Sequence, residues 1–320
     1  MSESQRTIPS SRYDDETDLR EVIRVLWAGK WLIAGITFAG TVISVIIVLA
    51  LPNVYRAEAL LTPNDNEGAG ALSALAAQYG GLASLAGINL AGGSSDKTAL
   101  GLEVLRSRRF IGDFIKRHDL LVPLMAASGW NPQTDQLKID SDIFDVSTKT
   151  WVRDVKPPKE STPSLLEAYE EFRDEVLDVR QDEQTGFVTL SVEHYSPAVA
   201  KQWADWLVKD LNATVMRQEV AEAEQAIEYL NKQIEATSLA DLQTVFFRLI
   251  EEQTKTVMLA NVSDEYLLKT IDPAVAPEEK AKPMRLLLVL IGAFLSGFLA
   301  LLLVLSVSGR VLGGKSGATV

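Results

Sequence analysis

One uncharged stretch near the C-terminus limits what this chain can fold into more than any other feature. Leu286–Ser308 has 23 residues without a charged side chain, and Arg285 and Arg310 flank it. As an α-helix it would be about 34 Å long, slightly more than the roughly 30 Å of hydrocarbon in a bilayer. Core helices of soluble proteins rarely run past about 20 residues in this way. The stretch therefore predicts a transmembrane helix.

A second uncharged run, Trp31–Leu51, lies near the N-terminus and ends at Pro52. Its 21 residues are too many for the apolar core of a typical signal peptide, no small-residue cleavage site follows it, and thirty residues precede it. We therefore expect a first, uncleaved transmembrane helix. Apolar side chains recur at helical spacing from Leu19 to Trp27, so this lead-in either lies along the membrane interface or extends the span.

Two spans put both termini on one side of the membrane and leave residues 52–285 as one large loop. Most basic residues close to the spans lie on the side of the two termini. Those on the terminal side are Arg20, Arg24, Lys30, Arg310 and Lys315. By the positive-inside rule, a bacterial inner membrane would hold spans 31–51 and 286–308, with cytoplasmic segments 1–30 and 309–320. The loop is then a periplasmic domain.

The charge of the loop limits its partners. It carries 24 Lys and Arg against 37 Asp and Glu, and an acidic surface repels phosphate backbones, so we expect no nucleic acid partner. The chain has no cysteine, and its two histidines, His118 and His194, lie 76 residues apart. Neither a metal-ligand spacing nor a nucleophile–base pair is present. We expect no catalytic residue, no metal and no cofactor, and hence no enzyme.

Alternating apolar residues predict a sheet in the loop. Residues 55–63 form one such run, and residues 177–195 form two runs around a turn at Asp182–Gly186, which is typical of a β-hairpin. Residues 265–271 predict a further short strand in the same sheet.

The segment at 68–93 consists mainly of Gly, Ala, Leu and Ser, and predicts either a mobile loop or a subunit contact. Residues 119–163 predict an irregular insert with Trp130 and Trp151 as packing anchors.

A long helix follows the hairpin. Ser196 and Pro197 are typical of a helix start, and no Gly or Pro interrupts residues 197–236. Forty helical residues span about 60 Å, whereas a domain of this size is about 45 Å across, so the helix must project. A second helix over 239–259 is expected to return antiparallel, with Leu242, Val245, Phe246, Leu249 and Val257 facing the first. The fold class is therefore an α/β (α+β) periplasmic domain with long projecting helices, anchored by two transmembrane helices.

One amphipathic helix is predicted over residues 100–118, with Leu102, Leu105, Phe110, Phe114 and Ile115 on its apolar face. The opposite face carries a basic cluster, namely Arg106, Arg108, Arg109, Lys116 and Arg117. The cluster suits contact with an acidic saccharide or a neighbouring subunit, although a solvated helix face is the more common role of such a charged run.

Small residues recur every fourth position in the second span. Gly292, Ser296 and Ala300 form one column, and Ala293 and Gly297 form another. This spacing lets helix backbones approach closely in lipid. The partner is either the first span, through Gly35, Ala39 and Gly40, or a neighbouring subunit.

Residues 309–316 match the phosphate-binding pattern GxxxxGK[ST] letter by letter. A working phosphate loop needs a strand before it and a helix after it, whereas a membrane span precedes this one. We interpret the match as accidental and Lys315 as a cytoplasmic anchor charge.

Three stretches together resemble the Wzz chain-length determinant family, the polysaccharide co-polymerases of Gram-negative inner membranes. They are LPNVYRAEALLTP at 51–63, TGFVTLSVEHYSPAVAKQWADWLVKDLN at 185–212, and IDPAVAPEEKAKPMR at 271–285. The third is a linker that contains Asp272, Pro273, Pro277 and Pro283, and it is the most specific part of the resemblance. Twelve residues follow the second span, so we expect a Wzz-type member without a kinase domain.

The resemblance implies a homo-oligomer that sets how many repeat units a polymerase adds to O-antigen or a related lipopolysaccharide glycan. Its implied partners are further copies of the chain, a Wzy-type polymerase, a lipid-linked glycan and the membrane. Two alternatives remain open. One is an adaptor that activates a separate cytoplasmic tyrosine kinase in capsule or exopolysaccharide export, and the other is a two-span periplasmic sensor.

Overall fold

A four-stranded antiparallel sheet lies in the domain that follows the first apolar helix and precedes the second in the sequence. The computed structural model describes residues 26–64, 93–237 and 239–313. The strands are β1 (Tyr55–Pro63), β6 (Leu177–Gln181), β7 (Val188–His194) and β8 (Leu268–Asp272), in the order β6-β7-β1-β8. All four predicted strands are therefore present, and the last begins at Leu268, three residues later than expected. Residues 19–25 of the predicted lead-in, the segment at 68–92 and Lys315 lie outside the described residues.

The hairpin between β6 and β7 forms where the sequence predicts it. The carboxylate of Asp182 accepts the backbone N–H groups of Gln184 and Thr185 at 2.9 and 2.8 Å. Gly186 has φ of +73°, a conformation that costs glycine little and other residues more. These local interactions fix the conformation of the turn, which determines the register between β6 and β7.

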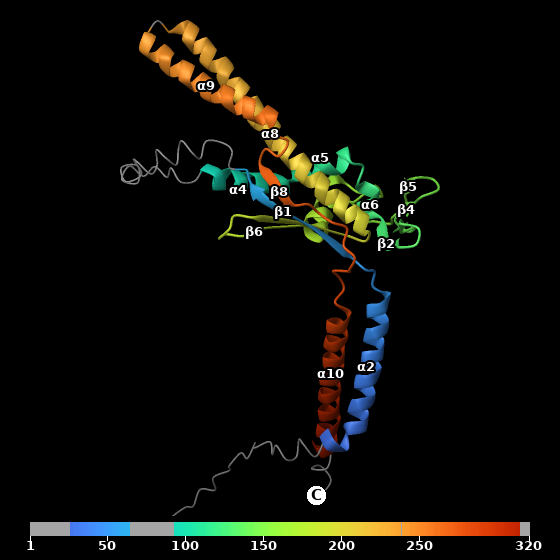
Figure 1. Ribbon diagram of the computed structural model, residues 1–320. Coiled ribbons are helices and arrows are strands. Elements are labelled where there is room, and N and C mark those ends of the chain that lie inside the picture. Colours follow the sequence, from blue (N-terminus) through green and yellow to red (C-terminus); the bar gives the residue numbers. More distant parts are fainter. Residues whose placement is uncertain (1–25, 65–92, 238, 314–320) are drawn as a thin grey trace, which may run out of the picture. The chain divides into compact units, whose positions relative to one another are not determined.

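Helix α8 (Pro197–Ala236) has the predicted bounds, and the side chain of Ser196 accepts the N–H of Val199 at its start. Its first half packs across the sheet through Trp203, Leu207 and Leu211, which are all buried. Helix α9 (Ala240–Val262) runs back along its second half, and this helical hairpin extends away from the sheet. The long helix therefore projects, as its length requires (Figure 1).

The predicted inward face of α9 is wrong in part. Leu242, Val245 and Leu249 are 44%, 49% and 40% exposed. The side chains that are at least half-buried recur instead along a neighbouring stripe, which includes Phe246, Val257 and the buried Ala260. Among the described residues, α9 packs mainly against one helix, α8, which covers one of the two adjacent apolar stripes. Periodicity alone does not show which stripe is covered.

The single helix predicted over residues 100–118 is also wrong. The chain forms α4 (Gly93–Arg106) and α5 (Arg108–Arg117), with Ser107 in an extended conformation between them. The Ser107 hydroxyl accepts the N–H of Phe110 at 3.2 Å and so caps α5. The five predicted apolar residues are nevertheless all buried, because the break redirects the second helix without reversing which side faces the core.

The insert at 119–163 is more regular than predicted. It contains α6 (Leu121–Met125) and two small hairpins, β2 (Ala127–Asn131) with β3 (Gln136–Ile139) and β4 (Phe144–Asp145) with β5 (Thr150–Trp151). Trp130 packs edge-on against Tyr55 at 5.6 Å between ring centroids, and Trp151 packs edge-on against Phe144 at 5.0 Å. Strands of two to four residues, such as β3, β4 and β5, have too little alternation to be recognised in a sequence.

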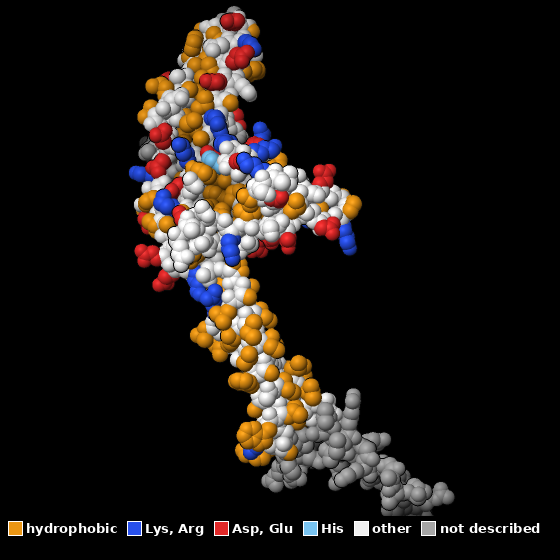
Figure 2. All heavy atoms as spheres, turned by 90° about the vertical axis from the view of Figure 1, so that its right-hand side faces the viewer, with side chains coloured by type: hydrophobic (Ala, Val, Ile, Leu, Met, Phe, Trp, Pro, Cys, Tyr) orange, Lys and Arg blue, Asp and Glu red, His pale blue; other side chains and the backbone are white. Residues whose placement is uncertain are grey.

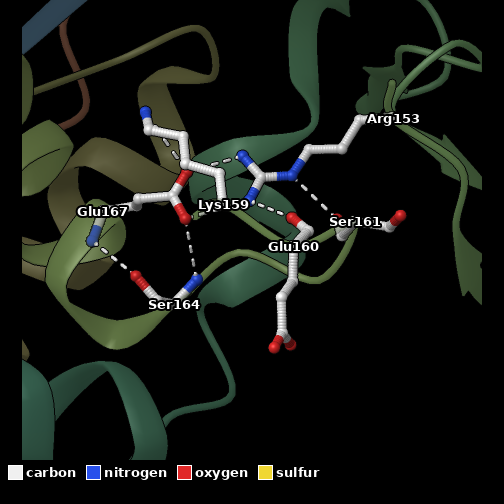
Figure 3. Close-up of polar contacts among 6 residues, drawn as sticks. All are labelled: Arg153, Lys159, Glu160, Ser161, Ser164 and Glu167. Atoms are coloured by element: carbon white, nitrogen blue, oxygen red, sulfur yellow. Dashed lines mark hydrogen bonds and ion pairs between the residues drawn. The ribbon is translucent and has the colours of Figure 1, made fainter. Parts of the chain in front are cut away.

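An ion pair connects the insert to the helix that follows it, α7 (Leu165–Glu171). Helix α7 continues into a short π-helix, η1 (Phe172–Val176). Figure 3 shows the guanidinium of Arg153 in a forked ion pair with Glu167, at 2.8 and 3.0 Å. Arg153 also donates to the backbone carbonyls of Glu160 and Ser161. Ser164 and Glu167 form a capping box at the start of α7, and the guanidinium of Arg153 holds the pKa of Glu167 at about 2.

Helices α2 (Lys30–Ala50) and α10 (Arg285–Gly313) form a separate unit. They pack side by side, and Figure 2 shows many hydrophobic side chains on the face of the pair that is turned to the viewer. Each is long and apolar enough to cross a membrane, so the pair fits a two-span membrane protein. Residues 309–313 continue α10 as helix, whereas a phosphate-binding pattern needs a loop there.

Candidate functional site

Two glycines lie where α2 and α10 are in close contact. A Cβ atom placed on Gly40 would overlap the side chain of Ser296, and one placed on Gly292 would overlap the side chain of Ser44. Any larger residue at either position would force the helices apart. In lipid, where packing rather than the hydrophobic effect holds helices together, such contacts are the main source of association.

The remaining small residues of α10 lie along the same interface. A Cβ on Gly297 would be 3.5 Å from the hydroxyl oxygen of Thr37, and Ala300 is fully buried. The Ser296 hydroxyl donates to the carbonyl of Ala293 at 3.0 Å. On α2 only Gly40 of the three suggested residues makes this contact, because Gly35 faces open space and Ala39 is exposed.

A buried carboxylate joins the two segments at which the sheet-bearing domain begins and ends. Glu193, on β7, has a side chain only 7% exposed. Its Oε1 accepts two hydrogen bonds from the guanidinium of Arg56, and its Oε2 lies 2.7 Å from Nζ of Lys282. Close by, Val54 and Lys282 exchange backbone hydrogen bonds at 3.0 and 3.2 Å. The entry and exit of the domain are thus held together by charge and by backbone pairing.

The proline linker leads from the sheet to this pairing. Asp272 is the last residue of β8 and pairs with Leu60. Pro273 and Pro277 follow in a segment without helix or strand, and Pro283 comes directly after Lys282. Proline fixes φ near −65° and cannot donate a backbone hydrogen bond, which favours an extended segment here.

The five basic residues of the predicted cluster do not share one environment. Arg106 donates to the carbonyl of Val179 on the edge strand β6 at 2.9 Å, and Arg117 lies 2.5 Å from Asp210 of α8. Both therefore support the fold. Arg108, Arg109 and Lys116 are exposed and have no charged partner among the described residues. Only these three remain as cations available to a ligand or subunit.

Each histidine has a defined structural position. His118 lies 2.9 Å from the Asp210 carboxylate and stacks on Trp206 with 4.1 Å between ring centroids. His194 is buried; its Nε2 donates to the carbonyl of Pro123 at 3.1 Å, and its Nδ1 accepts the N–H of Ser196 at 3.2 Å. This assigns the neutral tautomer with the proton on Nε2, and burial lowers the pKa of His194 to about 4.

One buried amide ties the long helix to the sheet. Asn212 of α8 is 2% exposed; its Oδ1 accepts the N–H groups of Leu267 and Leu268, and its Nδ2 donates to the carbonyl of Leu268. The sequence gives only a weak signal for this residue. An Asn on the apolar side of a helical pattern is the one hint that it has a partner to satisfy.

A groove of about 550 Å³ lies where α4, α8 and α9 meet. Polar side chains at its rim are Lys97, Gln218, Glu219, Glu222, Gln253 and Thr256. Among them, the Glu219 carboxylate lies 3.2 Å from Lys97 Nζ and accepts the Tyr266 hydroxyl at 2.6 Å. The sequence does not predict this site, because its walls come from three helices that are separated in the chain.

Residues 15–118 match the family model of the chain length determinant proteins, Wzz. The resemblance to the Wzz family is confirmed. The Wzz match covers α2, β1, α4 and α5, and so includes Gly40, Arg56 and the exposed cations of α5. The two other stretches that resemble Wzz proteins in the sequence, at 185–212 and 271–285, lie outside the matched range. A search of curated proteins by sequence finds no match.

Two solved structures of polysaccharide co-polymerases are similar to this chain at a low level. A full-length bacterial polysaccharide co-polymerase is 13% identical with a TM-score of 0.36, covering 94% of this chain and 100% of that one. A fragment of WzzB, the polysaccharide co-polymerase of Salmonella Typhimurium, is 11% identical with a TM-score of 0.32, covering 72% and 100%. Scores this low carry no argument about function.

Proposed function

We propose that this protein regulates the chain length of a bacterial surface polysaccharide, O-antigen or a related lipopolysaccharide glycan, and that it does so without being an enzyme. The observation that carries the proposal is the Wzz family match over residues 15–118. Both termini then lie in the cytoplasm and residues 52–285 in the periplasm. The two apolar helices and the basic residues at their terminal flanks support this orientation.

We infer that the protein works as a homo-oligomer. The stripe formed by Leu242, Val245 and Leu249 has no covering helix among the described residues. Hydrophobic side chains are visible along the hairpin in Figure 2, between charged ones. Contiguous exposed apolar surface marks interaction sites, and three- to four-residue spacing fits another helix. The same hairpin in a second copy provides such a helix.

The oligomer would act on a Wzy-type polymerase and on the lipid-linked glycan that the polymerase elongates. A rigid assembly beside the polymerase can hold the growing chain or the enzyme in place and so bias when elongation stops. The exposed cations Arg108, Arg109 and Lys116 are available to an acidic saccharide or to a neighbouring subunit. The small-residue interface of α2 and α10 would keep the membrane anchor rigid within each copy.

The proposal is tested by disrupting the stripe in the full-length protein. The double variant Leu242→Glu with Leu249→Glu should lower the mass of the detergent-solubilised assembly and remove the modal band of surface polysaccharide. Thr254→Glu is the matched control, since Thr254 is exposed on α9 outside the stripe. If the double variant keeps both the assembly mass and the modal band, this stripe is not an assembly surface.

A further inference from the structure

The groove between α4, α8 and α9 has the form of a binding site. Its floor is small and apolar, with Val104, Val215, Ala223 and Ala226 among the residues that line it. Its volume of about 550 Å³ is within the range of small-molecule pockets, roughly 300–1,000 Å³. Such pockets combine an apolar lining with a few polar groups that fix orientation, and sites between the helices of a bundle are common.

The polar groups at the rim are already ordered before a ligand arrives. Lys97 and Tyr266 hold the carboxylate of Glu219, and the amide of Gln218 donates to Glu222 at 3.0 Å. Ordered side chains lose little conformational entropy on binding. The amide of Gln253, on the facing helix, lines the groove and makes no side-chain hydrogen bond among the described residues. It offers two donors and one acceptor to a ligand in the groove.

The mixture of donors and acceptors selects a class of ligand. Two carboxylates against one ammonium group would repel a phosphate or a strongly anionic sugar. A purely apolar ligand would displace the water that is bound to these polar groups and would offer them no hydrogen bond in return. A hydroxyl both donates and accepts, and it therefore suits a rim that presents both kinds of group.

We propose that the groove binds a neutral or amino-substituted sugar segment of the polysaccharide whose length the protein regulates. The identity of that polysaccharide rests on the proposed function, whereas the class of ligand rests on the lining of the groove. The floor would contact the carbon face of a sugar ring, and Gln253, Glu222 and Lys97 would bond its hydroxyl or amino groups. This site is separate from the exposed cations of α5.

The test uses the full-length protein in detergent micelles and saturation-transfer NMR. The probe is the oligosaccharide repeat unit released from the surface polysaccharide of the bacterium that encodes the chain. Ala226→Phe fills the groove, and Ala221→Phe places the same side chain at an exposed position of α8 outside it. We expect binding by the wild type and by Ala221→Phe, and at least a fivefold weaker affinity for Ala226→Phe.

Gln253→Ala is a second variant that removes the amide with little effect on packing, and it should weaken binding about three- to tenfold. Absence of binding by the wild type, or equal affinity in all variants, would overturn the inference. These results are independent of the polysaccharide ladder of a deletion strain. A normal ladder in that strain, with groove-dependent binding retained, would reject the proposed function and leave the groove as a sugar site.

Discussion

Oε2 of Glu193 lies 2.7 Å from Nζ of Lys282, although the two residues are in a strand and in a linker far apart in the chain. Arg56 binds the other oxygen of the same carboxylate. The pair therefore belongs to a three-residue ion cluster that holds the first strand and the last segment of the domain together.

Glu193→Gln should lower the free energy of unfolding by about 2 kcal/mol, because two cations lose a buried acceptor of full charge. Thermal or denaturant unfolding of the purified full-length protein measures the loss. Glu58→Gln is the matched control, since Glu58 lies 3.8 Å from Arg56 with a side chain 54% exposed. Equal effects of the two substitutions would show that the Glu193 cluster contributes no more than a surface pair.

Acid should destabilise the protein partly through His194. Its folded-state pKa of about 4 is below the ordinary value of 6.5, so the unfolded chain binds the proton more readily. The stability that neutral His194 contributes is then complete above about pH 6.5 and is lost progressively as the pH falls to about 4.

The total loss across this pH window is about 3 kcal/mol by the linkage relation. Asp and Glu carboxylates also titrate in acid, so the informative quantity is the difference in stability between the wild type and His194→Gln. The variant should be less stable at pH 7 and should show a shallower slope between pH 6.5 and 4. Parallel stability curves would contradict the assignment of His194 as a buried neutral group.

Asn212→Ala should destabilise the fold by about 2–3 kcal/mol, because it leaves the N–H groups of Leu267 and Leu268 without their acceptor. Asn231→Ala, at an exposed position on the same helix, should change stability by less than about 0.5 kcal/mol. Chemical denaturation of both variants checks this. A small effect at Asn212 would mean that water replaces the amide.

Gly292→Leu should weaken the packing of α2 against α10, at a cost of about 1–3 kcal/mol, since its side chain would overlap Ser44. Gly35→Leu is the control because nothing lies within 4 Å of a Cβ at that position. Melting of the two variants in detergent distinguishes them. Equal melting temperatures would place the structurally important interface elsewhere.

Local signals in the sequence predicted much of the fold. Ser196 with Pro197 marked the start of the long helix, and Asp182 with Gly186 marked the hairpin turn. In both cases the residues that determine the conformation are neighbours in the chain, so a short window contains all the information required.

Features set by distant contacts could not be predicted in this way. The partners of Glu193 and Asn212 come from segments more than fifty residues away, and the groove residues come from three different helices. The break at Ser107 has a local cause, since its hydroxyl caps α5, but the apolar spacing continues across it and so predicts a single helix. The exposed stripe on α9 is wrongly predicted to face α8, because apolar spacing indicates a contact without identifying which helix makes it.

The most direct test of the proposed function is a gel of surface polysaccharide from a strain in which the gene is deleted. The proposal predicts that the modal band of chain lengths collapses to a short, unregulated ladder and that the plasmid-borne wild-type gene restores it. An unchanged ladder, with loss of total surface glycan or of a ligand response instead, would contradict chain-length regulation and favour the adaptor or sensor alternatives.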